Sequence, residues 1–344
     1  MQTRRMLVLS VSALAAWAVP AGVALAGKPG GGGGGTGGGT IYFAVQGTGT
    51  WSVWSMASDG SGKTQLPVAA VYGRLQAPSH QLHGERRWFV VRQDVGGTDP
   101  DGRPHAELFA VRDDGGASAQ LTADPDVAVT TSSWAKDDSF LSYAAVDFSV
   151  PGAPTSELLR VGLSFDGAGT PAPAGAPVSI VELPGVLGTV GSGQYVSPLI
   201  AGHDWAPTGG QVVWQDISSG GFELAGWTLH LTTVGGGTTT LATGGDSPQW
   251  SNDGVSIVFE STSGIDTISA SGANRTTIVK RGAGSPSVYF ELPEWSPTGT
   301  HVAYERIDKT LFGPRDVWRA TSSGASKTEL TGDVSAATQP LGWR

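Results

Sequence analysis

A repeated pattern of tryptophan, polar turn and apolar strand is the feature that most constrains the fold of this sequence. Its clearest copy is SPQWSNDGVSIVF, where Trp250 is followed by a turn ending at Gly254 and then by a β-branched and aromatic run. Trp205 and Trp295 begin similar turns 45 residues before and after Trp250. Repeats of this length, built from short strands, predict one large repetitive domain rather than the two average domains that 344 residues could hold.

Looser copies of the pattern extend the repeat over the rest of the chain. SSWAKDDSFLSY carries Trp134, and in PSHQLHGERRWFV the tryptophan position is taken by His80 and the glycine position by Gly84. The last copy is only begun, at Trp343. The tryptophan positions are therefore six, at residues 80, 134, 205, 250, 295 and 343.

Each complete copy predicts four strands, which we name A to D in chain order. Strand A ends at the tryptophan, B is aromatic, C ends in an Asp/Ser/Gly turn, and D ends near a leucine. The first copy lacks A, because residues 41–45, 51–57 and 64–67 match B, C and D, whereas the last copy has only A. Pairing the last strand with the first strands would close a ring and remove the free sheet edges. We therefore predict an all-β, six-bladed β-propeller with four-stranded blades.

The repeated tryptophans are expected to be structural. A large apolar ring at the same place in each blade can be buried between neighbouring blades. This interpretation covers Trp134, Trp205, Trp250, Trp295 and Trp343.

The N-terminal segment predicts export. Arg4 and Arg5 precede an apolar run and an Ala-Leu-Ala motif, which indicates a signal peptide at residues 1–26, and the two arginines are compatible with the twin-arginine route. A glycine tract at 27–39 is typical of a flexible linker, so the propeller is assigned to 40–344. We expect a periplasmic or secreted monomer with no transmembrane segment after signal cleavage. The chain has no cysteine, so its stability must come from its core. Its net charge of −9 argues against nucleic acid as a partner.

The W-S-P-D-G-like turn, the β-aromatic strand and the D-G turn together resemble the PD40 (WD40-like) repeat of TolB-like six-bladed propellers, over essentially all of residues 40–344. The resemblance is closest after Trp250 and Trp295. It implies the propeller fold and a protein-binding scaffold. The same repeat also forms the gating domain of prolyl-oligopeptidase-like enzymes, and oligogalacturonate lyases use a similar propeller with histidine metal ligands, so the resemblance leaves the function open.

One face of the predicted ring is expected to carry the function. The B-to-C and D-to-A connections emerge on the same face and hold most of the length variation, and long connections on a rigid scaffold are common binding sites. They are residues 93–105, 147–156, 183–202, 215–226, 282–292 and 306–315. Aromatic and charged residues on this face suit a protein interface, although its aromatics could instead anchor their own loops. The candidate partner-binding residues are Tyr72, Arg74, Tyr195, Phe222, Tyr289, Phe290, Asp308, Phe312 and Arg315.

The sequence predicts no catalytic residues and no cofactor, and offers only weak metal candidates. Asp99 and Asp101 have the spacing of a calcium-loop fragment, but an ordinary turn explains them as well. His80 and His203 could approach the channel from different blades. The predicted function is a non-catalytic scaffold that binds a protein or a cell-envelope polymer. The alternative is a propeller-type polysaccharide lyase or hydrolase with a His/Asp site at the channel mouth.

Overall fold

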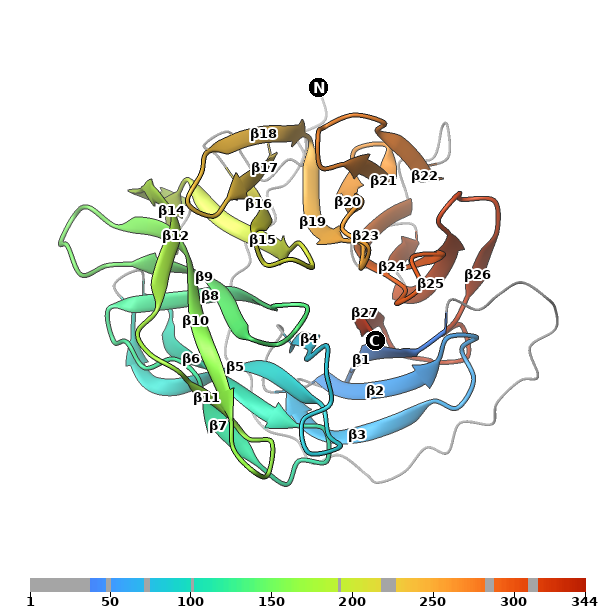
Figure 1. The fold of residues 1–344 in the computed structure, drawn as a ribbon, viewed down its shortest axis with the longest axis horizontal. Coiled ribbons are helices and arrows are strands. Elements are labelled where there is room, and N and C mark those ends of the chain that lie inside the picture. Colours follow the sequence, from blue (N-terminus) through green and yellow to red (C-terminus); the bar gives the residue numbers. More distant parts are fainter. Residues whose placement is uncertain are drawn as a thin grey trace.

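The chain folds into six antiparallel sheets arranged around a central axis, as Figure 1 shows from along that axis. The computed structural model describes residues 38–47, 51–70, 75–99, 102–190, 193–217, 227–281, 288–308 and 315–344. These residues form strands, turns and bends, and no helix occurs among them. The prediction of an all-β, six-bladed propeller is confirmed.

The A strands line the axis, and each contacts the A strands of the two neighbouring blades, so that they form a closed inner ring. They are β4 (Leu75–Pro78), β8 (Val127–Trp134), β15 (Leu199–Trp205), β19 (Gly245–Trp250), β23 (Val288–Trp295) and β27 (Thr338–Trp343). The B strands are β1 (Thr40–Gln46), β5 (Trp88–Thr98), β9 (Phe140–Asp147), β16 (Gln211–Ile217), β20 (Ser256–Ser261) and β24 (His301–Asp308).

The C and D strands complete each blade toward the outside. The C strands are β2 (Trp51–Ala57), β6 (Pro104–Arg112), β10 (Thr155–Phe165), β17 (Thr228–Thr233), β21 (Gly264–Ser269) and β25 (Arg315–Thr321). The D strands are β3 (Thr64–Ala70), β7 (Ser118–Gln120), β11 (Pro171–Pro173) with β12 (Val178–Pro184), β18 (Thr238–Thr243), β22 (Thr276–Lys280) and β26 (Lys327–Glu329). We number the blades 1 to 6 from the one that contains β1.

The ring closes where the sequence predicts. β27 pairs antiparallel with β1, with Ile41 opposite Trp343 and Val45 opposite Thr338. The backbone amides of Thr40 and Arg344 each donate to the carbonyl of the other residue, at 2.6 and 2.9 Å. Blade 1 therefore takes its A strand from the last residues of the chain and its other three strands from the first folded ones.

The A-to-B turns of blades 3 to 6 share one geometry. After Trp250, the amide of Ser251 donates to Ser256 O at 2.8 Å and the amide of Gly254 donates to Ser251 O at 3.0 Å. Gly254 has a φ of 71°, a conformation that glycine adopts without steric cost. In blade 3 the equivalent residue is Asp138, which takes a φ of 57°. We call the face that carries these turns the turn face, and the opposite face the long-connection face.

The tryptophans at the ends of the A strands are buried between neighbouring blades. Trp250, only 1% exposed, packs among Val213 and Leu229 of blade 4 and Ile257 and Phe259 of blade 5. Trp134, Trp205, Trp295 and Trp343 occupy the corresponding cores between other pairs of blades. Each indole ring contributes a large apolar area to the contact that holds two blades together.

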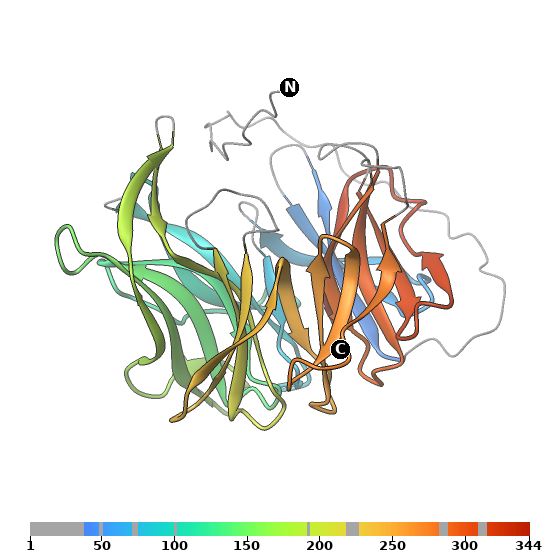
Figure 2. The ribbon, with the colours of Figure 1, turned by 90° about the horizontal axis from the view of Figure 1, so that it is seen from above.

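Much of the long-connection face is built from strand rather than loop, which corrects the sequence expectation. β5 extends to Thr98 and β6 begins at Pro104, so most of residues 93–105 is a β-hairpin. Residues 183–202 include a further hairpin, formed by β13 (Val186–Val190) and β14 (Gly193–Ser197). Figure 2 shows this yellow-green hairpin standing beyond the ring. Continued pairing satisfies the backbone groups that an irregular loop would leave to water.

Candidate functional site

The structure describes only part of the predicted partner-binding set. Tyr72, Arg74, Phe222 and Phe312 lie outside the described residues. Tyr195 lies in β14 and Asp308 ends β24, but their side chains are not described. The described members are Tyr289, Phe290 and Arg315, all at the long-connection end of blade 6.

The expectation that Phe290 is an exposed contact residue is wrong. Its side chain is 7% exposed and meets Tyr304 edge-to-face, with ring centroids 5.7 Å apart. Because β23 begins at Val288, Phe290 lies inside a strand and faces the core between blades 5 and 6. Tyr289, next to it, stays partly exposed, and the guanidinium of Arg281 lies 5.1 Å from its ring centroid. Of these two aromatics, only Tyr289 offers a surface to a partner.

Four carboxylates gather beside Tyr289 and Arg315. In blade 5, Asp246 of β19 stands opposite Glu260 of β20 in the strand register. In blade 6, Glu291 of β23 stands opposite Glu305 of β24 in the same way. We call these four residues the carboxylate cluster. Like charges directly opposite each other weaken a sheet, so both blades carry an electrostatic cost at this place.

Two arginines compensate the cluster only in part. Arg281 Nη2 lies 3.4 Å from Glu260 Oε1, and Arg315 Nη1 lies 3.0 Å from Glu305 Oε1 and 3.9 Å from Glu291 Oε2. Glu305 is fully buried, yet its Oε2 accepts no hydrogen bond from any described residue. An ionised oxygen that is buried without a partner is costly, so the charged form of Glu305 is unfavourable in the folded chain.

The surroundings oppose ionisation of all four carboxyls. Burial is the main cause that raises the pKa of Glu305 to about 7 and that of Asp246 to about 6, and the nearby Glu291 carboxylate contributes to both shifts. The pKa of Glu260 is raised by burial first and then by the charges of Asp246 and Glu291. Burial also raises the pKa of Glu291 against the opposing effect of the two arginines. A cation placed among these groups would favour their charged forms.

The repeat itself marks the cluster, a signal that the sequence analysis missed. Asp246 and Glu291 are 45 residues apart, and so are Glu260 and Glu305. The same step back into blade 4 leads to Ala201 and Gln215, which are uncharged. The carboxylate pair is thus an addition to blades 5 and 6 rather than a property of the repeat.

The weak metal candidates are not brought together. His203 is buried, its Nε2 lies 2.8 Å from Ser142 Oγ, and burial lowers its pKa to about 4. His80 of blade 2 has its pKa lowered by burial and by the positive charges of Arg344 and Lys136. Across the part of the chain that the structure describes, no group of three or more His, Cys, Asp or Glu residues could hold a metal ion.

Asp99 takes part in a hairpin turn. Its backbone carbonyl accepts from the Gly102 amide at 2.8 Å, and its carboxylate Oδ1 lies 2.7 Å from His105 Nδ1. Asp101 lies outside the described residues. The other ring nitrogen of His105 lies 3.2 Å from Glu107 Oε1, so the imidazole sits between two buried carboxylates. The sequence analysis did not single out His105, because a turn spacing does not show which side chains the hairpin brings together.

The described residues contain no helix with the length and apolar character needed to cross a membrane.

The fold is that of a TolB-like six-bladed β-propeller. The structure is similar to TolB from Acinetobacter baumannii, with a TM-score of 0.59 and 12% identity over 88% of this chain and 67% of that chain. It is also similar to a putative TolB from Agrobacterium tumefaciens, with a TM-score of 0.48 and 15% identity over 85% of this chain and 88% of the other. An oligogalacturonate lyase in complex with manganese matches with a TM-score of 0.46 and 13% identity, over 85% and 73%. No protein-family model and no curated protein matches the chain.

Proposed function

We propose that this chain is an exported, non-catalytic propeller scaffold that binds a protein partner through its long-connection face, with a basic group of the partner seated at the carboxylate cluster. The observation that carries the proposal is the pair of opposed carboxylates in each of blades 5 and 6, with the buried Glu305 Oε2 left without a described donor. A lysine or arginine of the partner would supply that donor.

Electrostatics and the neighbouring residues both support binding of a basic group at the carboxylate cluster. A basic side chain would relieve repulsion that the free protein bears, so part of its binding free energy would come from the removal of an existing cost. Tyr289 and Arg315 border the cluster, and tyrosine and arginine are enriched at the centres of protein interfaces. The net charge of −9 also favours a basic partner.

Capture from an envelope extract of the host tests the proposal. The bait is the chain without its predicted signal peptide, compared with a Glu291→Gln/Glu305→Gln variant. The matched control is Asp59→Asn/Asp253→Asn, which removes two exposed carboxylates from turns. We expect the wild type and the control to enrich the same protein, and the cluster variant to retain about ten-fold less of it. Equal retention by the cluster variant, or loss only in the control, would contradict the proposal.

A cell-envelope polymer as the ligand, or the lyase or hydrolase alternative, would give a different result. A polymer would enrich carbohydrate instead of a protein and would survive protease treatment of the extract. The enzymatic alternative needs a His/Asp site at the channel mouth. His80 and His203 belong to different blades, 2 and 4, and the His203 imidazole lies against Ser142 Oγ. No observation on the described residues favours it over the scaffold.

A further inference from the structure

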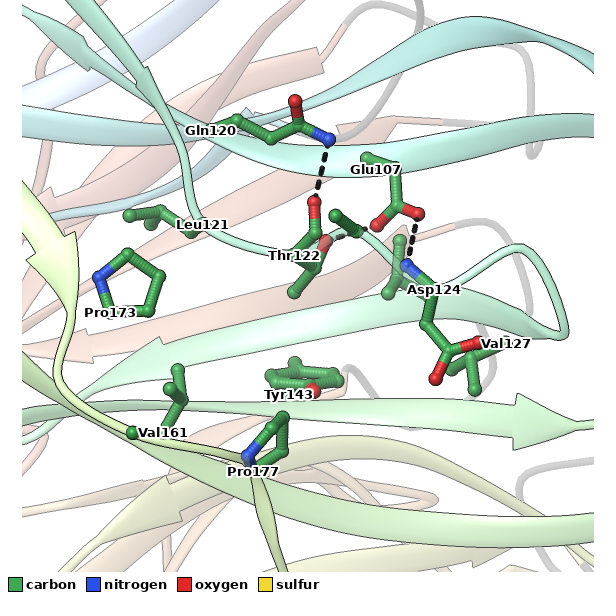
Figure 3. Close-up of a pocket in the computed structure, with 13 residues that line it drawn as sticks. Glu107, Gln120, Leu121, Thr122, Asp124, Val127, Tyr143, Val161, Pro173 and Pro177 are labelled. Atoms are coloured by element: carbon green, nitrogen blue, oxygen red, sulfur yellow. Dashed lines mark hydrogen bonds between the residues drawn. The ribbon is translucent and has the colours of Figure 1, made fainter.

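A cavity of about 360 Å³ lies between blades 2 and 3, away from the carboxylate cluster. Figure 3 shows it bordered on one side by β6, β7 and the connection that follows, and on the other by β8 to β11. Its volume falls within the range of roughly 300–1,000 Å³ that small-molecule sites occupy.

The split D strand of blade 3 accounts for the cavity. β10 pairs with β12 over Thr155–Arg160 and with β11 over Leu163–Phe165, so its outer edge is covered by two short strands instead of one. The connection between β11 and β12 passes beside Val161, where the Ala174 amide donates to Gly162 O at 2.7 Å. No other blade has two D strands among the described residues.

The walls of the cavity are mainly apolar. They are contributed by Leu121, Val127, Val129, Val161, Pro173 and Pro177. Prolines and β-branched side chains lose little freedom when a ligand packs on them, so these walls are preformed for an apolar body.

The polar end of the cavity is acidic. Glu107 is 2% exposed, and its Oε1 accepts from the Asp124 amide at 2.8 Å while its Oε2 accepts from Thr122 Oγ1. The carboxylate of Asp124 is exposed and lines the same space. Figure 3 shows Tyr143 between the acidic end and Pro177. Its hydroxyl has no hydrogen bond to any described residue, and burial and the nearby carboxylates raise its pKa, so it stays a neutral donor and acceptor.

The half-buried His105 and the buried Asp99 lie behind Glu107 and hold its position. His105 lies between Asp99 and Glu107, and its hydrogen bond to Asp99 raises its pKa. The His105 imidazole lies between the carboxylates of Asp99 and Glu107, and the Asp124 carboxylate lines the same end of the cavity, so carboxylates outnumber the one imidazole there.

From this combination we infer that the cavity binds a small organic ammonium, with the amine at the carboxylates of Glu107 and Asp124 and the apolar body between Pro173 and Pro177. The face of Tyr143 would add a cation–π contact, and its hydroxyl a hydrogen bond. A carboxylate ligand of the same shape is repelled by the acidic end, and a neutral alcohol loses the charge interaction. The site lies between blades 2 and 3, whereas the carboxylate cluster lies in blades 5 and 6.

Calorimetric titration of the whole protein with three matched probes tests this inference. The probes are 2-phenylethylamine, 2-phenylethanol and phenylacetate, which share a ring and differ in the charge of the end group. We expect the amine to bind with a millimolar or lower Kd, the alcohol to bind about ten-fold more weakly, and the acid to give no heat. No heat with the amine, or equal affinities for amine and alcohol, overturns the inference.

Single-residue variants then test whether the amine binds in this cavity. Asp124→Asn and Tyr143→Phe should each weaken amine binding by roughly three- to ten-fold without removing the cavity. Asp126→Asn is the matched control, because Asp126 is an exposed carboxyl two residues away that does not line the cavity. A similar loss in the control and in Asp124→Asn, or unchanged binding in both cavity variants, contradicts the assignment. Thermal melting of each variant verifies that it is folded.

Discussion

The two ends of this ring use buried carboxylates in opposite ways. At the turn face, Asp204 accepts from the Trp250 amide at 2.7 Å, from Ser133 Oγ at 3.1 Å and from Lys136 Nζ at 2.9 Å. One side chain of blade 4 thereby joins blades 3 and 5. At the long-connection face, Asp246 stands opposite Glu260, and Glu291 opposite Glu305. Among the described residues, Arg281 and Arg315 form ion pairs with these carboxylates.

Asp138 shows the same saturated pattern at the turn face. Its carboxylate accepts from the amides of His80 and Gln81 at 2.8 and 2.7 Å and lies 3.0 Å from His83 Nε2. It thus holds the copy of the repeat in which histidine replaces tryptophan. Burial of a carboxylate alone therefore does not show its role, because the carboxylates of Asp204 and Asp138 are satisfied by neighbouring blades and that of Glu305 is satisfied only in part.

We expect the largest loss of stability from the substitution of a buried tryptophan near the turn face. Trp250→Ala would remove a ring packed between blades 4 and 5 and leave a cavity there. We expect a loss of about 3–5 kcal/mol in the free energy of unfolding, measured by urea denaturation. Trp51, which lies only partly buried at the start of β2, provides the control, and Trp51→Ala should cost less than half as much. Equal losses of stability in the two variants would mean that packing between the blades does not make Trp250 more important than Trp51.

Asp204→Asn tests the saturated carboxylate. The amide keeps the shape but loses the charge opposite Lys136, whose ammonium would remain largely buried without it. We expect a loss of about 2–4 kcal/mol, whereas Asp137→Asn, at an exposed turn position of blade 3, should stay within about 0.5 kcal/mol. A loss as small as that of the control would show that Asp204 does not join the blades.

Glu305→Gln should raise the free energy of unfolding instead of lowering it, by an amount that depends on pH. The pKa of Glu305 in the folded chain is about 7, above the usual range of a glutamate in an unfolded chain, so the wild type loses stability as pH rises from about 4 through 7. Glutamine has no such loss. We expect almost no difference near about pH 4 and a gain on the order of 1–2 kcal/mol near about pH 8.

The comparison of wild type and variant at each pH removes the contributions of other groups. His203, whose pKa is lowered to about 4, destabilises the fold as pH falls below about 6.5, and it does so equally in both proteins. Urea denaturation at the two pH values gives the result. A gain of the same size at both would mean that Glu305 is not strained by its charge.

The smallest effect is expected in a single turn. Asp253 Oδ1 accepts from Ser251 Oγ at 2.6 Å and from the Val255 amide at 3.0 Å, on an exposed surface. Asp253→Ala should cost about 0.5–1 kcal/mol. Thermal melting with Asn252→Ala as the neighbouring control would detect it, and a loss above that of Asp204→Asn would reverse the comparison.

The ring could be predicted from the sequence because its signals repeat. The A-strand tryptophans, the glycines that need positive φ and the complementary first and last copies all specify the same closed architecture. Individual side chains were harder to place. Phe290 precedes Trp295 by five residues in a segment that could be loop or strand, and only the start of β23 at Val288 decides that it faces the core.

Hydrogen-bond partners across blades could not be predicted in the same way. Asp204 precedes Trp205, but the amide that it accepts from belongs to Trp250, and sequence spacing does not show the angle at which two blades meet. The carboxylate cluster could have been predicted from the sequence, because the 45-residue step relates its members in pairs. The cavity was not, because it depends on how β10 divides its edge between β11 and β12.

The seam between β1 and β27 has a consequence for the rate at which the fold is lost. Trp343 Nε1 donates to Gly38 O across 305 positions of sequence, so the seam depends on contacts between residues far apart in the chain. Such contacts make folding slow, because the entropy of closing a long loop is lost before they stabilise anything. Once formed, the seam leaves no free end from which the blades can detach one by one. The lifetime of the folded ring should therefore be set by the opening of this seam, and can be long even where the equilibrium stability is ordinary.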